Sequence, residues 1–487
     1  MASVAASPVN VPPRRRLLNR TMASYGFGAV AYGVKDSGFG TFLLLFYNQV
    51  VGLPSATVGL VVMLALLADA MIDPAVGFFS DRTRSRWGRR HPWMYASALP
   101  IAIGWIALWN PPALSEPMTL FWLFVCAVIT RSAVSCYEVP SVALTPELTA
   151  DYDERTRIMA YRYLFGWAGG LSMLVSAYLY FLAPANGGLL SRSGYGAFGI
   201  TGAVLMVIAI LVSALGTHHE IGNLPKPAII RGTLRDSFNE LRETLKNRAF
   251  AILMLAGVCA YTVQGISYAM SNYLYTYVWG IKGNTFAYVT VALFVGVIGA
   301  FVAAPRIGAH GNKARWAMLA VLLAAALNTA PYWLRLVGGF AAVGSPAMLP
   351  ALLGCFILGT ACSVTGFILG ASMMADVVED SEVRTGRRSE GVFFAGSFFV
   401  QKCTSGIGIF IAGAILAFAG FPAKAVPGQV PEATIDRLTI IYAGTWVTIA
   451  CFAAFFFFRF PFGRAEHEAR LAALAGAASV DAAPRKF

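Results

Sequence analysis

Long apolar runs alternate with short polar or basic breaks along the whole chain. A helix needs roughly 20 largely apolar residues to cross a bilayer. Runs of this kind cover approximately residues 25–51, 56–80, 92–113, 119–148, 158–183, 196–216, 249–280, 285–304, 315–338, 347–375, 391–421 and 438–460. Because lipid offers no partners for backbone polar groups, each run is predicted to be a helix. The pattern therefore predicts an all-α integral membrane protein with twelve transmembrane helices.

The composition fits a membrane protein and excludes several other classes. Hydrophobic residues make up 57% of the chain and charged residues 13%, whereas a soluble domain carries about 25% charged residues. The seven cysteines lie inside apolar runs without metal-ligand spacing, which indicates buried thiols rather than disulfides or a zinc site. The sequence has no nucleophile-elbow or phosphate-loop motif. We therefore expect no enzyme activity and no cofactor.

The distribution of the 37 basic residues indicates the orientation of the spans. Most of them lie in the N-terminal tail and in breaks that would share one side of the membrane. The opposite side would hold only Arg192, Lys282, Arg335, Lys424 and Arg437. Loops rich in Lys and Arg remain cytoplasmic, so both termini are predicted to be cytoplasmic in a multi-pass protein of the cell (inner) membrane. This asymmetry accounts for the net charge of +13 without nucleic acid as a partner.

The longest internal break separates six spans from six. The predicted units are a basic cytoplasmic arm (1–24), a six-helix bundle (25–216), a cytoplasmic linker (217–248), a second six-helix bundle (249–460) and a cytoplasmic tail (461–487). Apolar residues recur at helical spacing in the linker, which predicts an amphipathic helix, either on the membrane face or in solvent. Basic turns follow the second span (81–90) and the eighth (305–315), at equivalent places in the two halves. These features indicate the major facilitator architecture, here expected as a monomer.

Eight ionisable residues lie inside the predicted spans, although charges are costly in a bilayer and usually line a pathway. The acids are Asp36, Asp69, Asp73 and Glu138, and the bases are Lys35, Arg131, Arg162 and Lys402. Asp69 and Asp73 are four residues apart and therefore share one helix face. A sodium ion, a proton or a lysine can relieve the repulsion between two such carboxylates. The alternative is a pair of permanent structural salt bridges.

The intramembrane bases predict partners for these acids. Lys402 is too central in its span to reach the headgroups, so its expected partners are Asp69 and Asp73, provided that the two halves face one another. Arg131 and Arg162 offer planar donors suited to a carboxylate, a hydroxyl cluster or a phosphate. Their alternative role is to extend toward lipid headgroups from near a helix end. Glu138 precedes Val-Pro, where a kink in the helix is expected.

Several motifs together resemble the glycoside–pentoside–hexuronide cation symporter family. They are YGFGAVAYGVKDSGFG (25–40), DAMIDPAVGFFSDRTRSRWGRRHPW (69–93), YEVPSVALTPELTADYDERTR (137–157), MMADVVEDSEVRTGRRSEG (373–391) and QKCTSG (401–406). The resemblance implies cation (Na⁺ or H⁺)-coupled symport of a small sugar-type substrate across the bilayer by alternating access. It also implies cation ligands at Asp69, Asp73, Ser135 and Lys402, and substrate-binding residues at Asp36, Glu138 and Arg162.

The sequence departs from the melibiose-transporting branch of that family at several positions. Ile72 replaces an amide residue beside the acid pair, so sodium would lose an oxygen ligand at Asp69 and Asp73, whereas a proton needs only one carboxylate. Val142 and Phe367 stand where that branch has tryptophans, so its galactoside pocket is not expected. Arg131 has no counterpart in that branch. Phe367 and Arg131 are therefore candidate substrate-binding residues of a different pocket.

A cytoplasmic gate is predicted from charged residues on the basic side. Its candidates are Asp81, Arg82, Arg89 and Arg90 after the second span, and Asp376 and Arg387 after the tenth. Surface ion pairs are individually weak, which suits a latch that must open. The alternative is that these charges only set the topology. Two other functions stay open: a carrier of lysophospholipids or other amphipathic solutes, and a membrane sensor that has lost transport.

Overall fold

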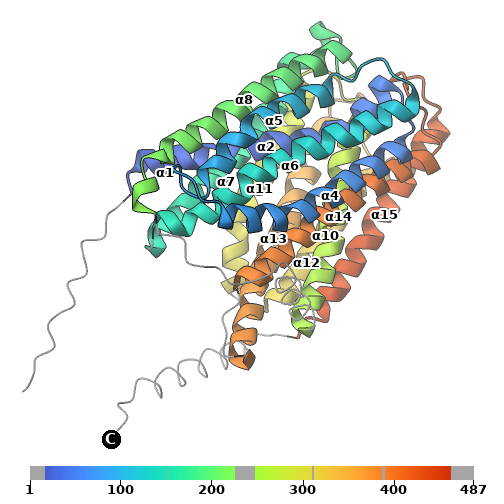
Figure 1. Cartoon of the computed structure of the whole chain (residues 1–487). Coiled ribbons are helices and arrows are strands. Elements are labelled where there is room, and N and C mark those ends of the chain that lie inside the picture. The colour runs from blue at the N-terminus through green and yellow to red at the C-terminus, as the bar shows by residue number, and fades with distance from the viewer. Residues whose placement is uncertain (1–16, 150, 225–246, 310–311, 386–389, 462–487) are drawn as a thin grey trace, which may run out of the picture.

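The computed structural model describes residues 17–149, 151–224, 247–309, 312–385 and 390–461, and within them the regular structure is entirely helical (Figure 1). The amphipathic helix predicted for the linker lies outside these residues, as do the first part of the basic arm and nearly all of the tail. An all-helical chain is the expected consequence of placing apolar segments in lipid.

The first half consists of one segmented span and five further spans. The first span comprises α1 (Asn19–Phe27), α2 (Val30–Ser37), η1 (Gly38–Phe42), α3 (Leu43–Leu45) and η2 (Phe46–Val51). The other spans are α4 (Ser55–Arg82), α5 (His91–Trp109), α6 (Glu116–Leu148), α7 (Tyr152–Ser176) with η3 (Ala177–Phe181), and α8 (Arg192–His218), and two short turns, η4 (Pro184–Asn186) and η5 (Ile221–Asn223), flank α8. Five glycines in residues 19–51 weaken regular helix; two of them lie inside the wide π-turn η1, and the π-turn η2 follows.

The second half consists of six spans. They are α10 (Arg248–Tyr273) with η6 (Leu274–Val278), α11 (Thr285–Ala309), α12 (Lys313–Leu336), α13 (Met348–Thr385), α14 (Glu390–Phe418) and α15 (Glu432–Phe458). In the described part of the chain, eleven helices are long and apolar enough to cross a membrane. Together with the segmented first span they account for the twelve predicted spans. α13 continues to Thr385, past the predicted end at residue 375. A charged sequence can extend a helix beyond the membrane, and hydropathy does not detect such an extension.

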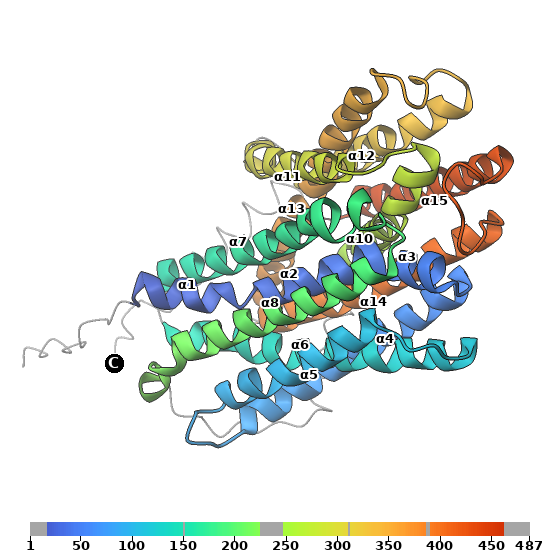
Figure 2. The ribbon, with the colours of Figure 1, turned by 90° about the horizontal axis from the view of Figure 1, so that it is seen from above.

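The two halves meet along α4 and α14, which lie side by side in both views (Figures 1 and 2). Small residues permit this close approach. A Cβ atom on Gly413 would lie 2.4 Å from the carbonyl oxygen of Ser55, and the Ser55 hydroxyl donates to the Gly413 carbonyl at 2.9 Å. The contact therefore brings the face of α4 that carries the acid pair against α14.

Hydrogen bonds between the halves gather at the end where η2 and η6 lie. Tyr273 donates to Asn48 Oδ1 at 2.9 Å, and Asn272 donates to the carbonyl of Thr41 at 3.1 Å. Gln49 Nε2 donates to the carbonyl of Pro422 at 3.0 Å. Toward the other end, which carries the basic turn 81–90, the second half has a separate apolar core of its own, and the bundles spread apart (Figure 1). The halves are thus closed at one end and divergent at the other.

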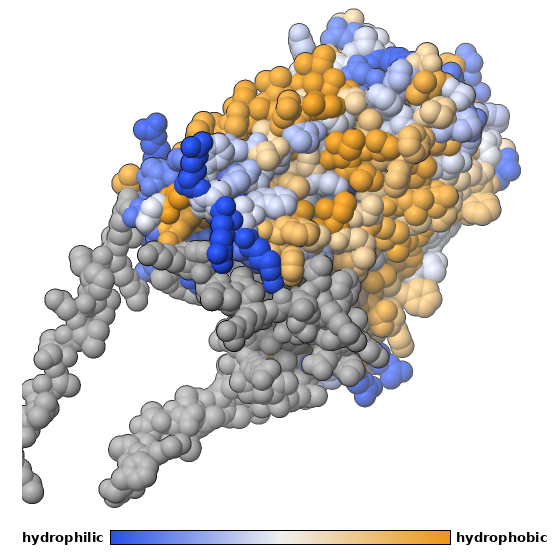
Figure 3. All heavy atoms as spheres, viewed as in Figure 1, coloured by the Kyte–Doolittle hydropathy of each residue, from blue (hydrophilic) through white to orange (hydrophobic). Residues whose placement is uncertain are grey.

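The surface agrees with a protein surrounded by lipid. Hydrophobic residues cover the sides of the bundle on the face seen in Figure 3, and hydrophilic residues gather toward its ends. Many large apolar side chains point outward, including Leu99, Ile103, Phe121, Leu215 and Ile298. Exposure of this extent would be unfavourable in water, so the sides of the bundle are the lipid-facing surface.

Candidate functional site

Two carboxylates on α4 meet two bases and a hydroxyl in the middle of the bundle. Arg131 and Ser135 come from α6, one turn apart, and Lys402 comes from α14. Arg131 binds Asp69 Oδ2 through Nη2 at 2.8 Å and through Nε at 3.0 Å, and Ser135 donates to Asp69 Oδ1 at 2.8 Å. We call these five residues, Asp69, Asp73, Arg131, Ser135 and Lys402, the charge cluster.

Lys402 connects the charge cluster across the two halves. Its Nζ lies 2.5 Å from Asp73 Oδ2 and 3.3 Å from Asp69 Oδ2, and it also donates to the Ser135 hydroxyl at 3.4 Å. The two distances confirm the prediction that Lys402 contacts both acids. Because α4 and α14 belong to different halves, this contact is sensitive to any relative movement of the halves.

The members of the charge cluster differ in burial. The Asp69 side chain is only 1% exposed, and Arg131 is also buried. The Asp73 side chain is 25% exposed, and its Oδ1 is a buried oxygen without a hydrogen-bond partner among the described residues. Asp69 is therefore fixed on all sides, whereas Asp73 keeps one free acceptor.

Lys35 and Asp36 form an ion pair on α2, with Nζ and Oδ1 2.9 Å apart. The two side chains have opposite environments, since Lys35 is buried and the Asp36 side chain is 60% exposed. The π-turn η1 follows immediately, and such turns are frequent at functional sites. Asp36 is thus an accessible carboxylate held by a buried ammonium.

Arg162 on α7 is buried and is oriented by α6 and α1. Its Nη1 donates to the Ser141 hydroxyl at 2.6 Å, and its guanidinium lies 5.3 Å from the ring of Tyr25. The Tyr25 hydroxyl in turn donates to the carbonyl of Ser141. Of the partners that the sequence left open for this guanidinium, the structure provides a hydroxyl, and it adds an aromatic ring that the sequence analysis did not predict.

The close packing of α2 against α7 brings Asp36 and Arg162 to the same side of the first half. A Cβ atom on Gly33 would lie 2.0 Å from the carbonyl oxygen of Gly166, so only glycine fits there. The Tyr32 hydroxyl on α2 donates to the backbone carbonyl of Arg162 at 3.4 Å. Tyr32 and Arg162 thus connect α2, which carries Asp36, to α7.

Glu138 and Phe367 complete the predicted substrate-binding set. Within the described ranges, the Glu138 carboxylate forms no hydrogen bond or ion pair with another side chain, and its charge acts on Arg162 and Lys402. The helix α6 continues through Pro140 to Leu148. Phe367 on α13 packs against Tyr261 of α10, with ring centroids 5.2 Å apart. Glu138 thus presents a carboxylate from the first half, and Phe367 presents an aromatic pair with Tyr261 from the second half.

The position of Arg131 differs from its assignment to the substrate. It binds Asp69, a member of the acid pair, and its guanidinium also lies 5.3 Å from the ring of Phe39. Arg131 precedes Ser135 by four residues, so both occupy the same face of α6. The four-residue spacing between Arg131 and Ser135 is the sequence feature from which a contact between Arg131 and the acid pair could be predicted.

Charged residues at the end of the first half form a compact network. Arg90 pairs with Asp81, and its Nε donates to Glu147 Oε1 at 3.0 Å. Arg89 Nη2 also approaches Glu147 Oε1, at 2.8 Å, while the Arg82 guanidinium lies 3.5 Å from the ring of Phe78. Glu147, the shared acceptor, was not among the predicted gate residues, although it lies in the acidic end of the fourth span.

The second half has an equivalent pair at the same end. Lys313 at the start of α12 binds both oxygens of Asp376 on α13, at 2.9 and 3.0 Å. Arg90 and Glu147 occupy the corresponding ends of α5 and α6, so the halves repeat the arrangement. Arg387, the other predicted gate residue of this half, lies outside the described residues. The Arg90–Glu147 and Lys313–Asp376 pairs each join two helices of the same half.

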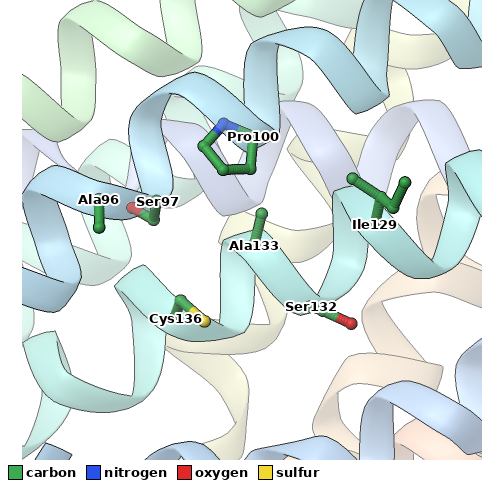
Figure 4. A pocket seen from close by; sticks show the side chains of 7 residues that line it. All are labelled: Ala96, Ser97, Pro100, Ile129, Ser132, Ala133 and Cys136. Atoms are coloured by element: carbon green, nitrogen blue, oxygen red, sulfur yellow. The ribbon is translucent and has the colours of Figure 1, made fainter.

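A pocket of about 310 Å³ lies between α5 and α6. It is lined by Ala96, Ser97, Pro100, Ile129, Ser132, Ala133 and Cys136 (Figure 4). No charged residue lines it, and Ala96, Pro100 and Ile129 are exposed on the lipid-facing side. We therefore assign it to the outer surface of the bundle and not to the candidate site.

Twelve spans in two repeated halves around paired buried charges define a multi-pass membrane transporter. The sequence model of the family described as MFS/sugar transport protein matches residues 24–464. The chain belongs to this family of the major facilitator superfamily, and it is a transporter and not an enzyme. The resemblance to glycoside–pentoside–hexuronide symporters is thereby confirmed.

The chain is similar to several named transporters over most of its length. It is 29% identical to an uncharacterized symporter of Synechocystis sp., with 84% of this chain and 87% of that protein covered. It is 26% identical to the isoprimeverose transporter of Lactiplantibacillus pentosus, with 87% and 85% covered. It is 24% identical to sodium-dependent lysophosphatidylcholine symporter 1 of Gallus gallus, with 84% and 81% covered.

The fold is also similar to that of solved transporters. The inward open conformation of the xylose transporter XylE from E. coli has a TM-score of 0.59 at 12% sequence identity, with 91% of this chain and 96% of that chain covered. At this identity the likeness establishes the fold.

Proposed function

We propose that the protein couples the movement of a cation, Na⁺ or H⁺, to the symport of a sugar-type solute by alternating access. The observation that carries the proposal is the ion pair between Lys402 and Asp73, which joins the two halves at 2.5 Å in the middle of the bundle. Rigid-body rocking of two repeats around a central site is the general mechanism of such folds. An ion pair across the moving boundary links the charge state of the site to that movement.

The substrate site is proposed to comprise Asp36, Glu138 and Arg162, with Phe367 and Tyr261 as an aromatic wall. Sugars expose hydroxyl groups, which carboxylates and guanidinium groups bind through hydrogen bonds. Asp36 is exposed and Glu138 has no partner among the described side chains, so both retain acceptors for substrate. The relatives named as symporters or as sugar transporters support this substrate class.

The coupling site is proposed to be the charge cluster. Binding of a cation near Asp69 and Asp73 would compete with Lys402 and thereby loosen the contact between α4 and α14. The charge of Glu138 acts on both Lys402 and Arg162, which provides an electrostatic connection between the coupling site and the substrate site. A membrane potential of 100 mV contributes about 2.3 kcal/mol per translocated charge.

Orientation and gating follow from the positive-inside rule. We propose that both termini are cytoplasmic, so the divergent end faces the cytoplasm and the structure is inward-facing. The units proposed from the sequence, two bundles of six spans at 25–216 and 249–460, would be the rocking bodies of a monomer. The networks around Glu147 and Asp376 would brace the cytoplasmic ends of the two halves.

The proposal is tested by uptake into proteoliposomes. Purified protein should accumulate labelled pentosides, glycosides or hexuronides when a Na⁺ or H⁺ gradient is imposed, and dissipation of that gradient should abolish accumulation. The second candidate is a lysophospholipid carrier, which the similarity to the lysophosphatidylcholine symporter favours. Lysolipid uptake without any sugar uptake would support that second candidate and exclude the first.

A further inference from the structure

Asp69 has no coordination capacity left for an additional ion. Its Oδ2 accepts a hydrogen bond from Arg131 Nε and lies 2.8 Å from Arg131 Nη2 and 3.3 Å from Lys402 Nζ. Its Oδ1 accepts from Ser135 at 2.8 Å. The side chain is 1% exposed, so water and ions from either end cannot reach it without movement of these partners.

The charge cluster is already balanced. Asp69 and Asp73 contribute two negative charges, and Arg131 and Lys402 contribute two positive charges. An additional metal cation would leave a net positive charge in the middle of the bilayer, which is unfavourable. Neutral balance is therefore reached without an ion from solution.

The oxygen set also does not fit sodium. A hard cation takes about six oxygen ligands, and Ile72, next to Asp73, offers no side-chain oxygen. Among the described residues, Asp73 Oδ1 is the one carboxylate oxygen of the cluster without a partner. A single free carboxylate oxygen is not a sodium site.

We infer that Arg131 is a tethered cation that occupies the charge position of a coupling sodium ion at Asp69, and that the protein therefore works independently of Na⁺. The inference rests on the proposed function, since it concerns the coupling site of that transporter. It assigns to Arg131 a role in ion selectivity and removes it from the substrate-binding set.

The choice of arginine fits this role. A guanidinium stays charged at any physiological pH and supplies several donors in a fixed plane. Arg131 and Asp69 lie on α6 and α4 of the same half, so rocking of the halves leaves their contact in place. Lys402 and Asp73 lie in different halves. The tethered charge thus fixes one acid and leaves the other as the acid that responds to movement.

The test compares ion-specific stabilisation of purified variants in detergent. Thermal unfolding midpoints are measured in NaCl and in choline chloride at equal ionic strength, up to about 100 mM, since a ligand that binds the folded state raises the midpoint. The wild type is expected to show the same midpoint in both salts. Arg131→Gln, which frees Asp69, is expected to gain a midpoint increase specific to NaCl.

Two further variants serve as controls. Arg131→Lys keeps a positive charge beside Asp69 and is expected to remain insensitive to Na⁺, as is the double variant Asp69→Asn/Arg131→Gln, which removes both charges. A Na⁺-specific increase in the wild type, or none in folded Arg131→Gln, would overturn the inference. If Arg131→Gln does not fold, the wild-type comparison decides. No substrate is needed, so failure to find sugar uptake would affect only the proposed function.

Discussion

The ammonium of Lys402 lies 2.5 Å from Oδ2 of Asp73, and the two residues belong to different halves of the molecule. Asp69 lies one helical turn before Asp73 on α4. It forms a second ion pair with Arg131 of α6, inside a single half. One pair therefore crosses the boundary that alternating access must shift, and the other stays within a rigid body. This division underlies the predictions that follow.

Replacement of Lys402 by methionine should destabilise the protein and abolish gradient-driven uptake. It leaves Asp73 without its ion-pair partner, which for a buried pair amounts to about 3 kcal/mol, reduced here because the Asp73 side chain is 25% exposed. The double variant Lys402→Met/Asp73→Asn should recover most of the thermal stability but not the uptake. Equal midpoints for Lys402→Met and the wild type would contradict the importance of this pair.

Arg162→Lys should weaken substrate binding by about tenfold, or about 1.4 kcal/mol. The lysine cannot reproduce a planar guanidinium that donates to Ser141 while it lies against the Tyr25 ring. Arg157→Lys on the same helix is the matched control, since Arg157 is exposed and donates to Asn19. Substrate binding is measured by titration of the purified variants. A similar loss in both variants would point to a general effect on α7.

Glu147→Gln should lower the thermal stability and slow transport, because it removes the negative charge that Arg89 and Arg90 share and replaces one of its two acceptor oxygens with a donor NH₂ group. A cost of about 1–3 kcal/mol is expected for hydrogen bonds to charged groups that lose their partner. The control is Asp436→Asn, which removes the pair with Arg335, where the Asp436 side chain is 40% exposed. Such a pair contributes less than about 1 kcal/mol. The prediction fails if the two variants lose equal stability.

Hydropathy alone predicts most of the fold, because the bilayer imposes a minimum length and helical geometry on every span. It does not predict where a helix ends outside the membrane. The charged end of α13 reaches Thr385, and α15 begins at Glu432, before the predicted span. Hydropathy also does not predict that the first span is divided into the segments α1 to η2, since that division depends on glycines and local packing.

The candidate site is predictable in part, because buried charges must find partners of opposite sign. That requirement alone pairs Lys402 with Asp69 and Asp73. It does not reveal which base takes which acid, since that depends on how α4, α6 and α14 are rotated against one another. The contact between Arg131 and Asp69 and the shared acceptor Glu147 are therefore not predictable from this requirement alone, and the substrate-binding role of Arg131 stays a prediction.

The most direct test of the account is accumulation of substrate by Asp73→Asn in proteoliposomes. The variant should still exchange substrate across the membrane at equilibrium, because Asp36, Glu138 and Arg162 are unchanged. It should no longer concentrate substrate under an imposed ion gradient, so that the ratio of internal to external substrate falls to about one, the limit without coupling. Gradient-driven accumulation equal to that of the wild type would contradict the assignment of Asp73 as the coupling acid.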